Sequence, residues 1–396
     1  MLSLLCQRWA IPLEYDSFFI FRGDIFMNYK IGRSAAADAQ SAVSEACNGL
    51  QNPKFIFFSS GIKHFTDYTS ILHQKYPQAT IMGTTAYTSL CAEGSFRGEL
   101  CLIGFTDGVQ CAANVLEEAD RYPVRYVERL EQAANRIGST NGDDTLCFVA
   151  MSAFCSCEEL VLSTLHSVLH KKKIPVIGGT AADNGSEMKS FVSLDGVVYD
   201  KSCVFAILRF TGTRIHFYRE NIYKPISDKY VTVTKADPTT RTVYEFNGRP
   251  AAVVEAEAFG TTVSGLPSIM DSHPLGRIIG NDVYIIANAA VGKDQKSMQY
   301  HARIYDNSQI VFMEPDDYKS VIANTCQKIK QDVPHPKLAL MIHCIARSMH
   351  FESMHYLDTY AKEMGHVLGT YIGFSGYGEQ LHDQQFNQTM TVAVFE

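Results

Sequence analysis

The segment PVIGGTAADN at residues 175–184 has the residue types of a loop that binds a phosphate group. An apolar run ends in Gly178 and Gly179, and small polar residues and Asp183 follow. A dinucleotide-binding loop needs a third glycine and a P-loop needs Gly-Lys-Ser/Thr, and this segment has neither. Because glycine after a strand often only lets the chain turn, the segment by itself favours a structural turn.

Arg347 follows the apolar run LALMIHC at 338–344, and its guanidinium could hold a carboxylate through two parallel hydrogen bonds. This would suit an amino-acid-like ligand, whose amino group Glu379 could take. The structural alternative is an internal ion pair of Arg347, most simply with Glu379, and both roles can coexist. Asp183 and Asn387 are further ligand candidates, although Asp and Asn side chains often satisfy their own turns.

Cysteine chemistry is a second possibility. Cys344 follows His343 directly, but adjacent residues of a strand point to opposite faces, which argues against His343 as the base for that thiol. Cys157 stands at the start of a predicted helix, which lowers a thiol pKa, yet nothing places a base near it. The sequence shows no Ser-His-Asp order and no His-x-x-x-His helix. A thiol-dependent enzyme is therefore the weaker alternative, and we expect neither catalysis nor a metal site.

Composition predicts a globular protein of the reducing cytoplasm. The chain has 396 residues, more than one hydrophobic core usually supports, so we expect two domains. A formal net charge of −7 argues against a nucleic-acid partner, which would need a basic surface. The eleven cysteines show no disulfide or zinc spacing. No apolar run is long enough for a membrane span, and residues 1–26 make a poor signal peptide, so we interpret them as an N-terminal extension.

One order of elements occurs three times along the chain: strand, helix, strand with glycines, and hairpin. The three copies are 54–105, 145–208 and 337–395. The predicted helices are 67–77, 157–173 and 349–364. Ser156 and Glu159 predict a capping box for the second helix, and Gly365 is expected to end the third. The sequence therefore predicts a strand-helix-strand-hairpin module used three times.

An additional segment, about 213–330, separates the second and third copies. It alternates apolar and polar residues around Asp237 and Pro238, which is typical of a hairpin. We expect an α/β N-terminal unit at 27–212, with two module copies. An α+β C-terminal unit at 213–396 would then hold the third copy at 337–396.

Each of the three glycine segments follows the second strand of its module, where α/β sheets gather their ligands. The segments are IMGTTAY, VIGGTAAD and YIGFSGYG. We expect them to form loops that share one end of the structure and build one compound pocket.

Five motifs occur in order along the chain: VIGGTAADN, PLG, HCIAR, GFSGYGEQ and FNQTMTVAVF. Together they resemble the FIST family from about Tyr29 to the end of the chain. The resemblance implies a cytoplasmic signalling protein with FIST N-terminal and C-terminal domains that bind a small ligand, with amino acids suggested. Some members resemble haem-based nitric-oxide sensors that work beside a histidine kinase or a cyclic-dinucleotide enzyme. We recognise no output segment in this chain, so we expect the signal to pass to a separate protein.

The resemblance also assigns residues. Those that match its motifs are Gly178, Gly179, Asp183, Pro274, Leu275, Gly276, Cys344, Arg347, Gly373, Tyr377, Gly378, Glu379 and Asn387. Together with the glycine segments they give our candidate ligand-binding residues: Gly83, Thr84, Gly178, Gly179, Thr180, Asp183, Cys344, Arg347, Tyr377, Glu379 and Asn387. The chain departs from the family at Ile345 and Ala346, which replace smaller residues and narrow that turn.

Haem would require an axial His, Cys or Met in a large apolar pocket. His301 and His343 are the least unsuitable of the thirteen histidines, and no spacing singles them out. The haem alternative therefore depends on the family resemblance.

Overall fold

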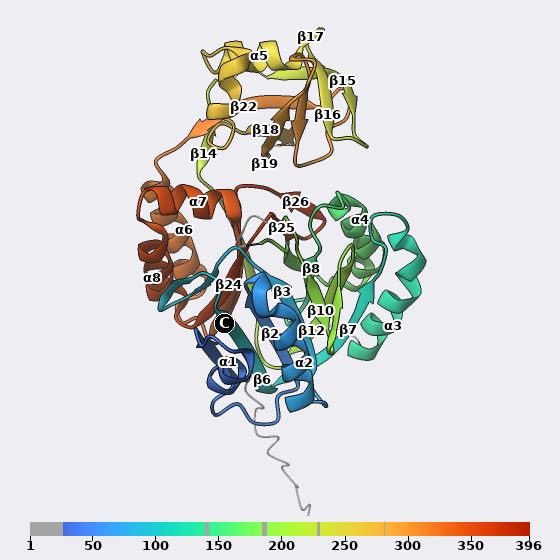
Figure 1. Ribbon diagram of the computed structural model, residues 1–396, viewed down its shortest axis with the longest axis vertical. Coiled ribbons are helices and arrows are strands. Elements are labelled where there is room, and N and C mark those ends of the chain that lie inside the picture. Colours follow the sequence, from blue (N-terminus) through green and yellow to red (C-terminus); the bar gives the residue numbers. More distant parts are fainter. Residues whose placement is uncertain (1–26, 139–141, 184–187, 228–229, 281) are drawn as a thin grey trace, which may run out of the picture.

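The protein consists of a body with three β-sheets and a smaller unit stacked on one end of it (Figure 1). The computed structural model describes residues 27–138, 142–183, 188–227, 230–280 and 282–396; the predicted extension 1–26 lies outside them. We call residues 28–221 together with 316–396 the body, and residues 223–315 the inserted unit. The fold is mixed α/β, as the sequence predicted.

Each of the three sheets of the body has six strands. The first sheet contains, in spatial order, β1 (Asn28–Ser34), β6 (Leu100–Asp107), β2 (Phe55–Ser60), β3 (Thr80–Thr85), β10 (Val192–Leu194) and β11 (Val197–Tyr199). The second contains β26 (Gln384–Phe386), β25 (Gly378–Leu381), β9 (Val176–Thr180), β8 (Thr145–Met151), β12 (Cys203–Phe210) and β7 (Val109–Leu116). The third contains β13 (Ile215–Asn221), β27 (Thr389–Phe395), β23 (Leu338–Cys344), β24 (Tyr371–Gly376), β4 (Ser89–Cys91) and β5 (Gly94–Phe96).

The strand orders of these three sheets correspond. In each sheet one strand has a parallel neighbour on one side, as in β2–β3, β8–β9 and β23–β24, and an antiparallel neighbour on the other. The hairpin after each second strand pairs with a sheet of another segment: β4–β5 with β24, β10–β11 with β3, and β25–β26 with β9. The exchange of hairpins ties the three sheets together. Equivalence of the three segments as repeats stays a prediction.

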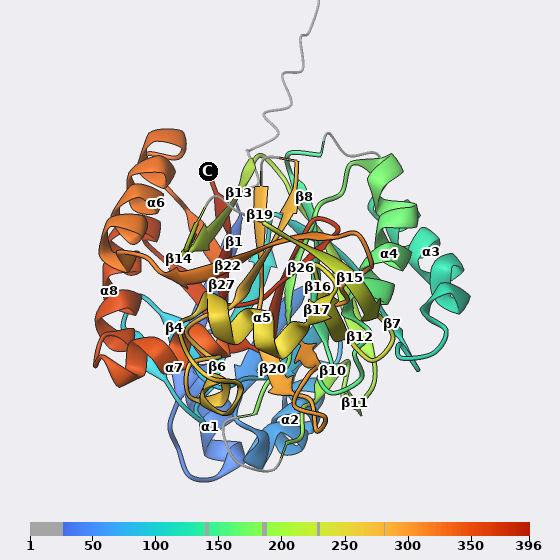
Figure 2. The same ribbon diagram turned by 90° about the horizontal axis from the view of Figure 1, so that it is seen from above.

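The three sheets enclose a shared core and carry helices on their outer faces (Figures 1 and 2). Phe57 of the first sheet packs against Phe148 of the second at 4.7 Å and Phe374 of the third at 5.8 Å between ring centroids. Because both faces of these sheets are covered, strands such as β2 and β8 are continuously apolar and buried. The outer helices are α1 (Ala39–Ala46) and α2 (Phe65–Lys75) on the first sheet, α3 (Val127–Ile137) and α4 (Glu158–Leu169) on the second, and α6 (Tyr318–Asp332), α7 (Ile345–Ser353) and α8 (Leu357–Leu368) on the third. Single-turn helices are η1 (Ile62–His64), η2 (Pro123–Tyr126) and η3 (His170–Lys172).

The inserted unit holds a fourth, antiparallel sheet with its own core. Its strands are β14 (Tyr223–Pro225), β15 (Val231–Asp237), β16 (Thr242–Phe246), β17 (Arg249–Pro250), β18 (Leu275–Ile279), β19 (Asp282–Ile286), β20 (Asn288–Val291), β21 (Met298–Tyr300) and β22 (Gln309–Pro315). The predicted hairpin around Asp237 is present as β15–β16. Helices α5 (Ala251–Ala258) and η4 (Val263–Ser268) cover this sheet.

All three predicted helices differ from the structure at their ends: 67–77 is α2 at Phe65–Lys75, and 157–173 is α4 at Glu158–Leu169 followed by η3. The single helix expected at 349–364 is two helices, α7 and α8, separated at His355, whose φ is 54°. Gly365 does not end α8, which continues to Leu368 and is followed by Gly369 at φ +65°. A Cβ at Gly365 would lie 2.8 Å from Ala92, so this glycine lets the helix pack on the β4–β5 turn. The capping box is also absent: Cys157 is the N-cap of α4, and no side chain bonds the helix start.

The sequence predicted loops at Gly83, Gly178 and Gly373, and this prediction was wrong. These residues lie within β3, β9 and β24 and are buried. A Cβ at Gly178 would lie 2.0 Å from the carbonyl oxygen of Val149, so this glycine allows β8 and β9 to approach. At Gly179 a Cβ would meet Ile342 and Phe374 of the third sheet within 3 Å. The close packing of strands and sheets accounts for the glycines.

Candidate functional site

Three backbone hydrogen bonds form a closed ring where β3, β9 and β24 end. The amide of Tyr377 donates to the carbonyl of Thr180 at 2.9 Å, and the amide of Ala182 to that of Thr85 at 3.1 Å. The ring closes where the amide of Tyr87 donates to Ser375 at 3.0 Å. The ends of β3, β9 and β24 are therefore in contact, and a pocket built by the three glycine segments stays a prediction.

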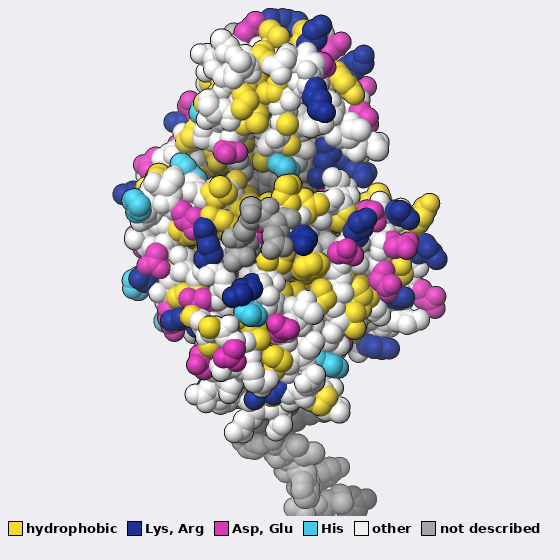
Figure 3. Space-filling model, in the orientation of Figure 1, with side chains coloured by type: hydrophobic (Ala, Val, Ile, Leu, Met, Phe, Trp, Pro, Cys, Tyr) yellow, Lys and Arg dark blue, Asp and Glu magenta, His cyan; other side chains and the backbone are white. Residues whose placement is uncertain are grey.

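Asp183 and Tyr377 meet beside this ring. The Tyr377 hydroxyl donates to Asp183 Oδ1 at 2.5 Å, and Asp183 is 4% exposed with Oδ2 unpartnered among the described residues. The exposed Phe154 packs edge-on against the Tyr377 ring at 5.2 Å. Figure 3 shows hydrophobic side chains gathered on the face below the inserted unit. These two predicted site residues thus come together, with the exposed Phe154 against the ring of Tyr377.

Gly83, Thr84 and Thr180 lie inside the sheets. The Thr84 hydroxyl donates to the carbonyl of Thr85 at 3.1 Å, and a Cβ at Gly83 would touch Phe58. Thr180 accepts from Gln380 Nε2 at 3.0 Å through its hydroxyl and is buried. Local packing and hydrogen bonding thus occupy these three residues in the structure.

Arg347 is fully enclosed and pairs with Glu220 of β13, so the expected Glu379 partner is wrong. One guanidinium nitrogen contacts the Glu220 carboxylate and another donates to the Glu220 carbonyl at 3.2 Å. The guanidinium also lies over the ring of Phe351 at 5.1 Å and that of Tyr360 at 5.5 Å. The arrangement favours the structural alternative, an internal ion pair.

Glu379 lies on β25 and is enclosed by protein. Its Oε2 accepts from the amide of Thr389 at 3.0 Å and the hydroxyl of Thr389 at 2.6 Å, and Oε1 has no partner among the described residues. Burial raises the pKa of Glu379 to about 8, because an ionised carboxylate is poorly solvated there. The Cys344 thiol contacts this carboxyl group, and burial also raises the pKa of Cys344. A neutral, enclosed thiol is a poor nucleophile.

The FNQT motif joins the body to the inserted unit, whereas the PLG motif packs within the inserted unit. Asn387 accepts from the amide of Ala287 at 3.5 Å, and Gln388 Nε2 donates to the carbonyl of Asp271 at 2.8 Å. Within the inserted unit, the Pro274 carbonyl accepts from the amide of Met313 at 3.0 Å. Leu275 is fully buried, and a Cβ at Gly276 would meet the side chains of Val283, Val311 and Met313 within 3 Å.

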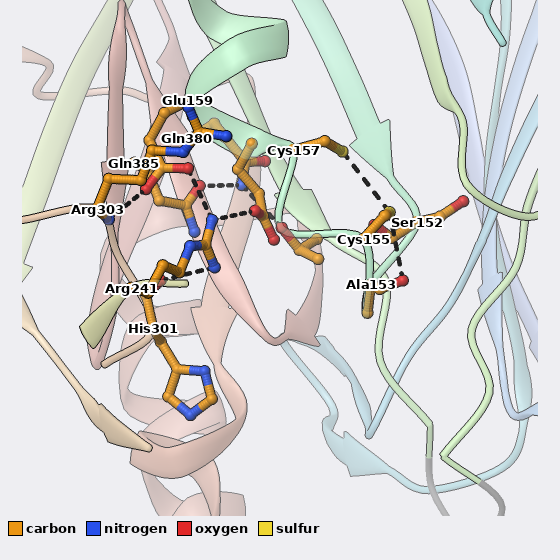
Figure 4. A network of polar contacts seen from close by, with 12 residues as sticks. Ser152, Ala153, Cys155, Cys157, Glu159, Arg241, His301, Arg303, Gln380 and Gln385 are labelled. Atoms are coloured by element: carbon orange, nitrogen blue, oxygen red, sulfur yellow. Dashed lines mark hydrogen bonds and ion pairs between the residues drawn. The ribbon is translucent and has the colours of Figure 1, made fainter. Parts of the chain in front are cut away.

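A cluster of charged side chains at this junction was not predicted from the sequence (Figure 4). Arg241 of the inserted unit donates to Glu158 Oε2 and to Glu159 Oε2 at the start of α4, each at 2.7 Å. Glu159 Oε1 also accepts from the amide of Arg303 at 2.8 Å, which is why it does not cap its own helix. The sequence signal for this cluster is the acidic first turn of α4, Glu158 and Glu159, of which Glu159 was expected in a capping box.

Arg277 completes the junction cluster without an ion pair among the described residues. One of its terminal nitrogens donates to the Arg303 carbonyl at 3.0 Å, and its Nε has no partner. Burial lowers the pKa of Arg277, while the more distant Glu159 partly compensates. We use the name junction cluster for Glu158, Glu159, Arg241, Arg277 and Arg303.

Neither histidine considered for haem lies in a suitable place. His343 is fully buried, its Nδ1 bonds Ser348 at 2.8 Å, and burial lowers its pKa well below the usual value. Its ring packs against Phe351 and Tyr360 in the core. His301 is surface-exposed beside the Arg241 network (Figure 4). No pocket whose lining is described contains either residue.

The described part of the chain holds no group of three or more His, Cys, Asp or Glu side chains placed to bind a metal ion. No helix in that part is long and apolar enough to cross a membrane.

Two protein-family domains match this chain. The FIST N domain matches residues 54–249 and the FIST C domain matches residues 251–382. The chain belongs to the FIST family. FIST domains are signalling sensory domains. The family boundary at 249–251 lies inside the inserted unit, whereas the sequence pattern predicted a boundary at 212–213.

Individual relatives add little to the family match. An uncharacterized protein of Methanocaldococcus jannaschii is 30% identical over 231 residues, which are 54% of this chain and 43% of that protein. The match thus spans less than half of the relative. Among solved structures, PurLQS from Thermotoga maritima aligns with 93% of this chain and 72% of its own, at 9% identity and a TM-score of 0.21. This likeness is too weak to carry an argument.

Proposed function

We propose that this FIST protein is the ligand-binding part of a signalling sensor, and that a small carboxylate such as an amino acid binds at the junction cluster. The observation that carries the proposal is the partly buried Arg277, which has no carboxylate partner among the described residues. A guanidinium removed from water without a counter-charge is costly, and a carboxylate ligand would supply that charge.

The charges around Arg277 support an amino acid over a simple anion. The junction cluster has three arginines and two glutamates, so it retains one net positive charge. The two glutamates could hold an ammonium group beside the carboxylate, at the expense of part of their pairing with Arg241.

A ligand in this place would act on both parts of the molecule, since the cluster joins α4 of the body to the β15–β16 turn and to the segment between β21 and β22 of the inserted unit. Binding would then shift the balance between arrangements of the two parts, and a separate output protein would read the change. We propose a histidine kinase or a cyclic-dinucleotide enzyme as that protein, and no catalysis by this chain. The haem alternative has less support, because neither His301 nor His343 lines a described pocket.

We further propose that 54–105, 145–208 and 337–395 are copies of one module. The corresponding strand orders and the ring of hydrogen bonds support this. Superposition of the three segments should bring Gly83, Gly178 and Gly373 into register, and a mismatch there would contradict the proposal.

Calorimetric titration with the common amino acids tests the ligand. Acetate and propylamine, which each carry one half of the recognised group, show whether the carboxylate dominates. We expect Arg277→Gln to weaken binding by roughly ten- to a hundred-fold, the value of a charge-assisted hydrogen bond. Arg249→Gln is the matched control, because Arg249 forms an exposed ion pair with Glu257 on the same unit. Equal affinity of the Arg277→Gln and wild-type proteins for every carboxylate would overturn the proposal.

A further inference from the structure

Cys155 and Cys157 form a pair of thiols in contact at the start of α4. Their Sγ atoms are 3.6 Å apart, with the Cys157 thiol donating to Cys155. Cys157 is 1% exposed, whereas Cys155 is partly exposed. A reagent in solution can therefore reach the Cys155 thiol, and the buried Cys157 thiol contacts Cys155 from the protein interior.

The loop that carries the pair lies between two contacts, the packing of Phe154 on Tyr377 and the ion pair of Glu158 with Arg241. Phe154, the residue before Cys155, packs on Tyr377, whose hydroxyl bonds Asp183. Glu158, the residue after Cys157, pairs with Arg241 of the inserted unit. Each contact is made by a residue next to one of the two cysteines, so a covalent bond between them would disturb both contacts.

The backbone of this loop is held in an unusual conformation. Phe154 and Ser156 have φ of 65° and 50°, in the left-handed region that non-glycine residues rarely adopt. The Cys155 thiol donates to the carbonyls of Ser152 at 3.2 Å and Ala153 at 3.5 Å (Figure 4). Formation of a disulfide removes these donors and draws the two sulfur atoms to about 2.0 Å. The loop and the first turn of α4 must then rearrange.

We propose that Cys155 and Cys157 are a redox-sensitive pair that a hydroperoxide converts into a disulfide, which loosens the Arg241–Glu158 link between the body and the inserted unit. The Cys155 thiolate attacks the terminal hydroperoxide oxygen, so the O–O bond breaks and an alcohol leaves after protonation. The pKa of the Cys157 thiol is raised by its hydrogen bond to Cys155 and by burial, and is not lowered by the helix start as the sequence predicted, so its contact with Cys155 must carry the second step. The Cys157 sulfur attacks the adjacent Cys155 Sγ as its proton passes to the departing hydroxide, the S–S bond forms, and the S–O bond breaks with loss of water. Two thiols are oxidised by two electrons in all, and one hydroperoxide is reduced to alcohol and water.

The disulfide should be readily reversible. It closes a ring through a single intervening residue, and such strained or accessible disulfides are the ones that cellular thiols reduce. This sensing mode does not depend on the carboxylate ligand proposed above. A negative thiol titration would therefore overturn only the redox proposal, and a negative ligand titration only the carboxylate proposal.

The test uses the full-length protein, treated with excess tert-butyl hydroperoxide and titrated for free thiols after denaturation. We expect the wild-type protein to lose two thiols and dithiothreitol to restore both. Cys155→Ser should lose none under the same conditions. Cys157→Ser, and the alternative Cys157→Ala if the first is unstable, should trap Cys155 as a sulfenic acid that a dimedone probe labels.

Cys326→Ser is the matched control, because Cys326 is a partly exposed thiol on α6, in a different sheet layer. It should behave as the wild type does. Hydrogen exchange should show faster exchange in the first turn of α4 after oxidation. The proposal is overturned if the wild-type protein keeps all its thiols, if Cys155→Ser loses two, or if exchange in α4 is unchanged by oxidation.

Discussion

Arg241 and Glu158 form an ion pair of 2.7 Å between the inserted unit and the body, and each side chain is about nine-tenths buried. A charge in such a place depends on its partner, because removal of one member leaves the other desolvated and unpaired. The link between the two parts of this protein is therefore strong only while both residues are present.

Removal of this pair should destabilise the protein. We expect Arg241→Ala to lower the free energy of unfolding by about 3–5 kcal/mol, because Glu158 is then buried without a counter-charge. Arg249→Ala, which removes an exposed pair with Glu257, should cost about 0–1 kcal/mol. Urea titration followed by circular dichroism measures both. An Arg241→Ala midpoint equal to that of Arg249→Ala would contradict the expectation.

Stability should fall as pH rises between about 5 and 8. Burial raises the folded-state pKa of Glu379 to about 8, above its ordinary value of 4.5, so the folded state holds a proton that the unfolded state releases. The resulting stability is fully present below pH 4.5 and is lost as pH rises toward 8, at up to about 1.4 kcal/mol per pH unit. Glu255, whose pKa burial also raises to about 8, contributes with the same sign.

Glu379→Gln should flatten this pH dependence, because glutamine resembles the protonated acid. Denaturation at a series of pH values from 5 to 8 gives the slope for the wild type and the variant. Glu257→Gln, at an exposed site, is the control and should leave the slope as it is. An unchanged slope in Glu379→Gln would show that this carboxyl is ionised in the folded state.

Arg347 should act on stability and leave ligand binding intact. Its contacts with Glu220, Phe351 and Tyr360 are all internal. We expect Arg347→Lys to lower the melting temperature, because an ammonium cannot reproduce both guanidinium contacts with Glu220. Thermal shift with and without the amino acid panel separates the two roles. Weakened binding by a normally stable Arg347→Lys protein would return Arg347 to the ligand site.

Gly178 should tolerate no side chain. A Cβ would lie 2.0 Å from the backbone oxygen of Val149, so Gly178→Ala must force β8 and β9 apart and cost about 1–3 kcal/mol or more. Gly265→Ala is a milder control, since its Cβ would meet chiefly the rotatable hydroxyl of Thr261. If Gly178→Ala unfolds at the same urea concentration as the wild type, the glycine has a role other than strand packing.

The sequence by itself determined the local elements and the family. Local patterns predicted the helix that is present as α4 (Glu158–Leu169), and turn residues at Asp237 predicted the hairpin β15–β16. The five motifs identified a FIST protein. These features depend on neighbouring residues or on short patterns, which a single chain displays directly.

Only the tertiary structure decided which elements pair and which charges meet. Hairpins such as β25–β26 add to the sheet of another segment, and no local pattern specifies that choice. Arg347 pairs with Glu220, and Arg241 pairs with Glu158, because the fold places these carboxylates, distant in sequence, beside them. The glycines expected in loops lie in strands for the same reason: what excludes a Cβ at Gly178 is an atom of another strand, Val149 O.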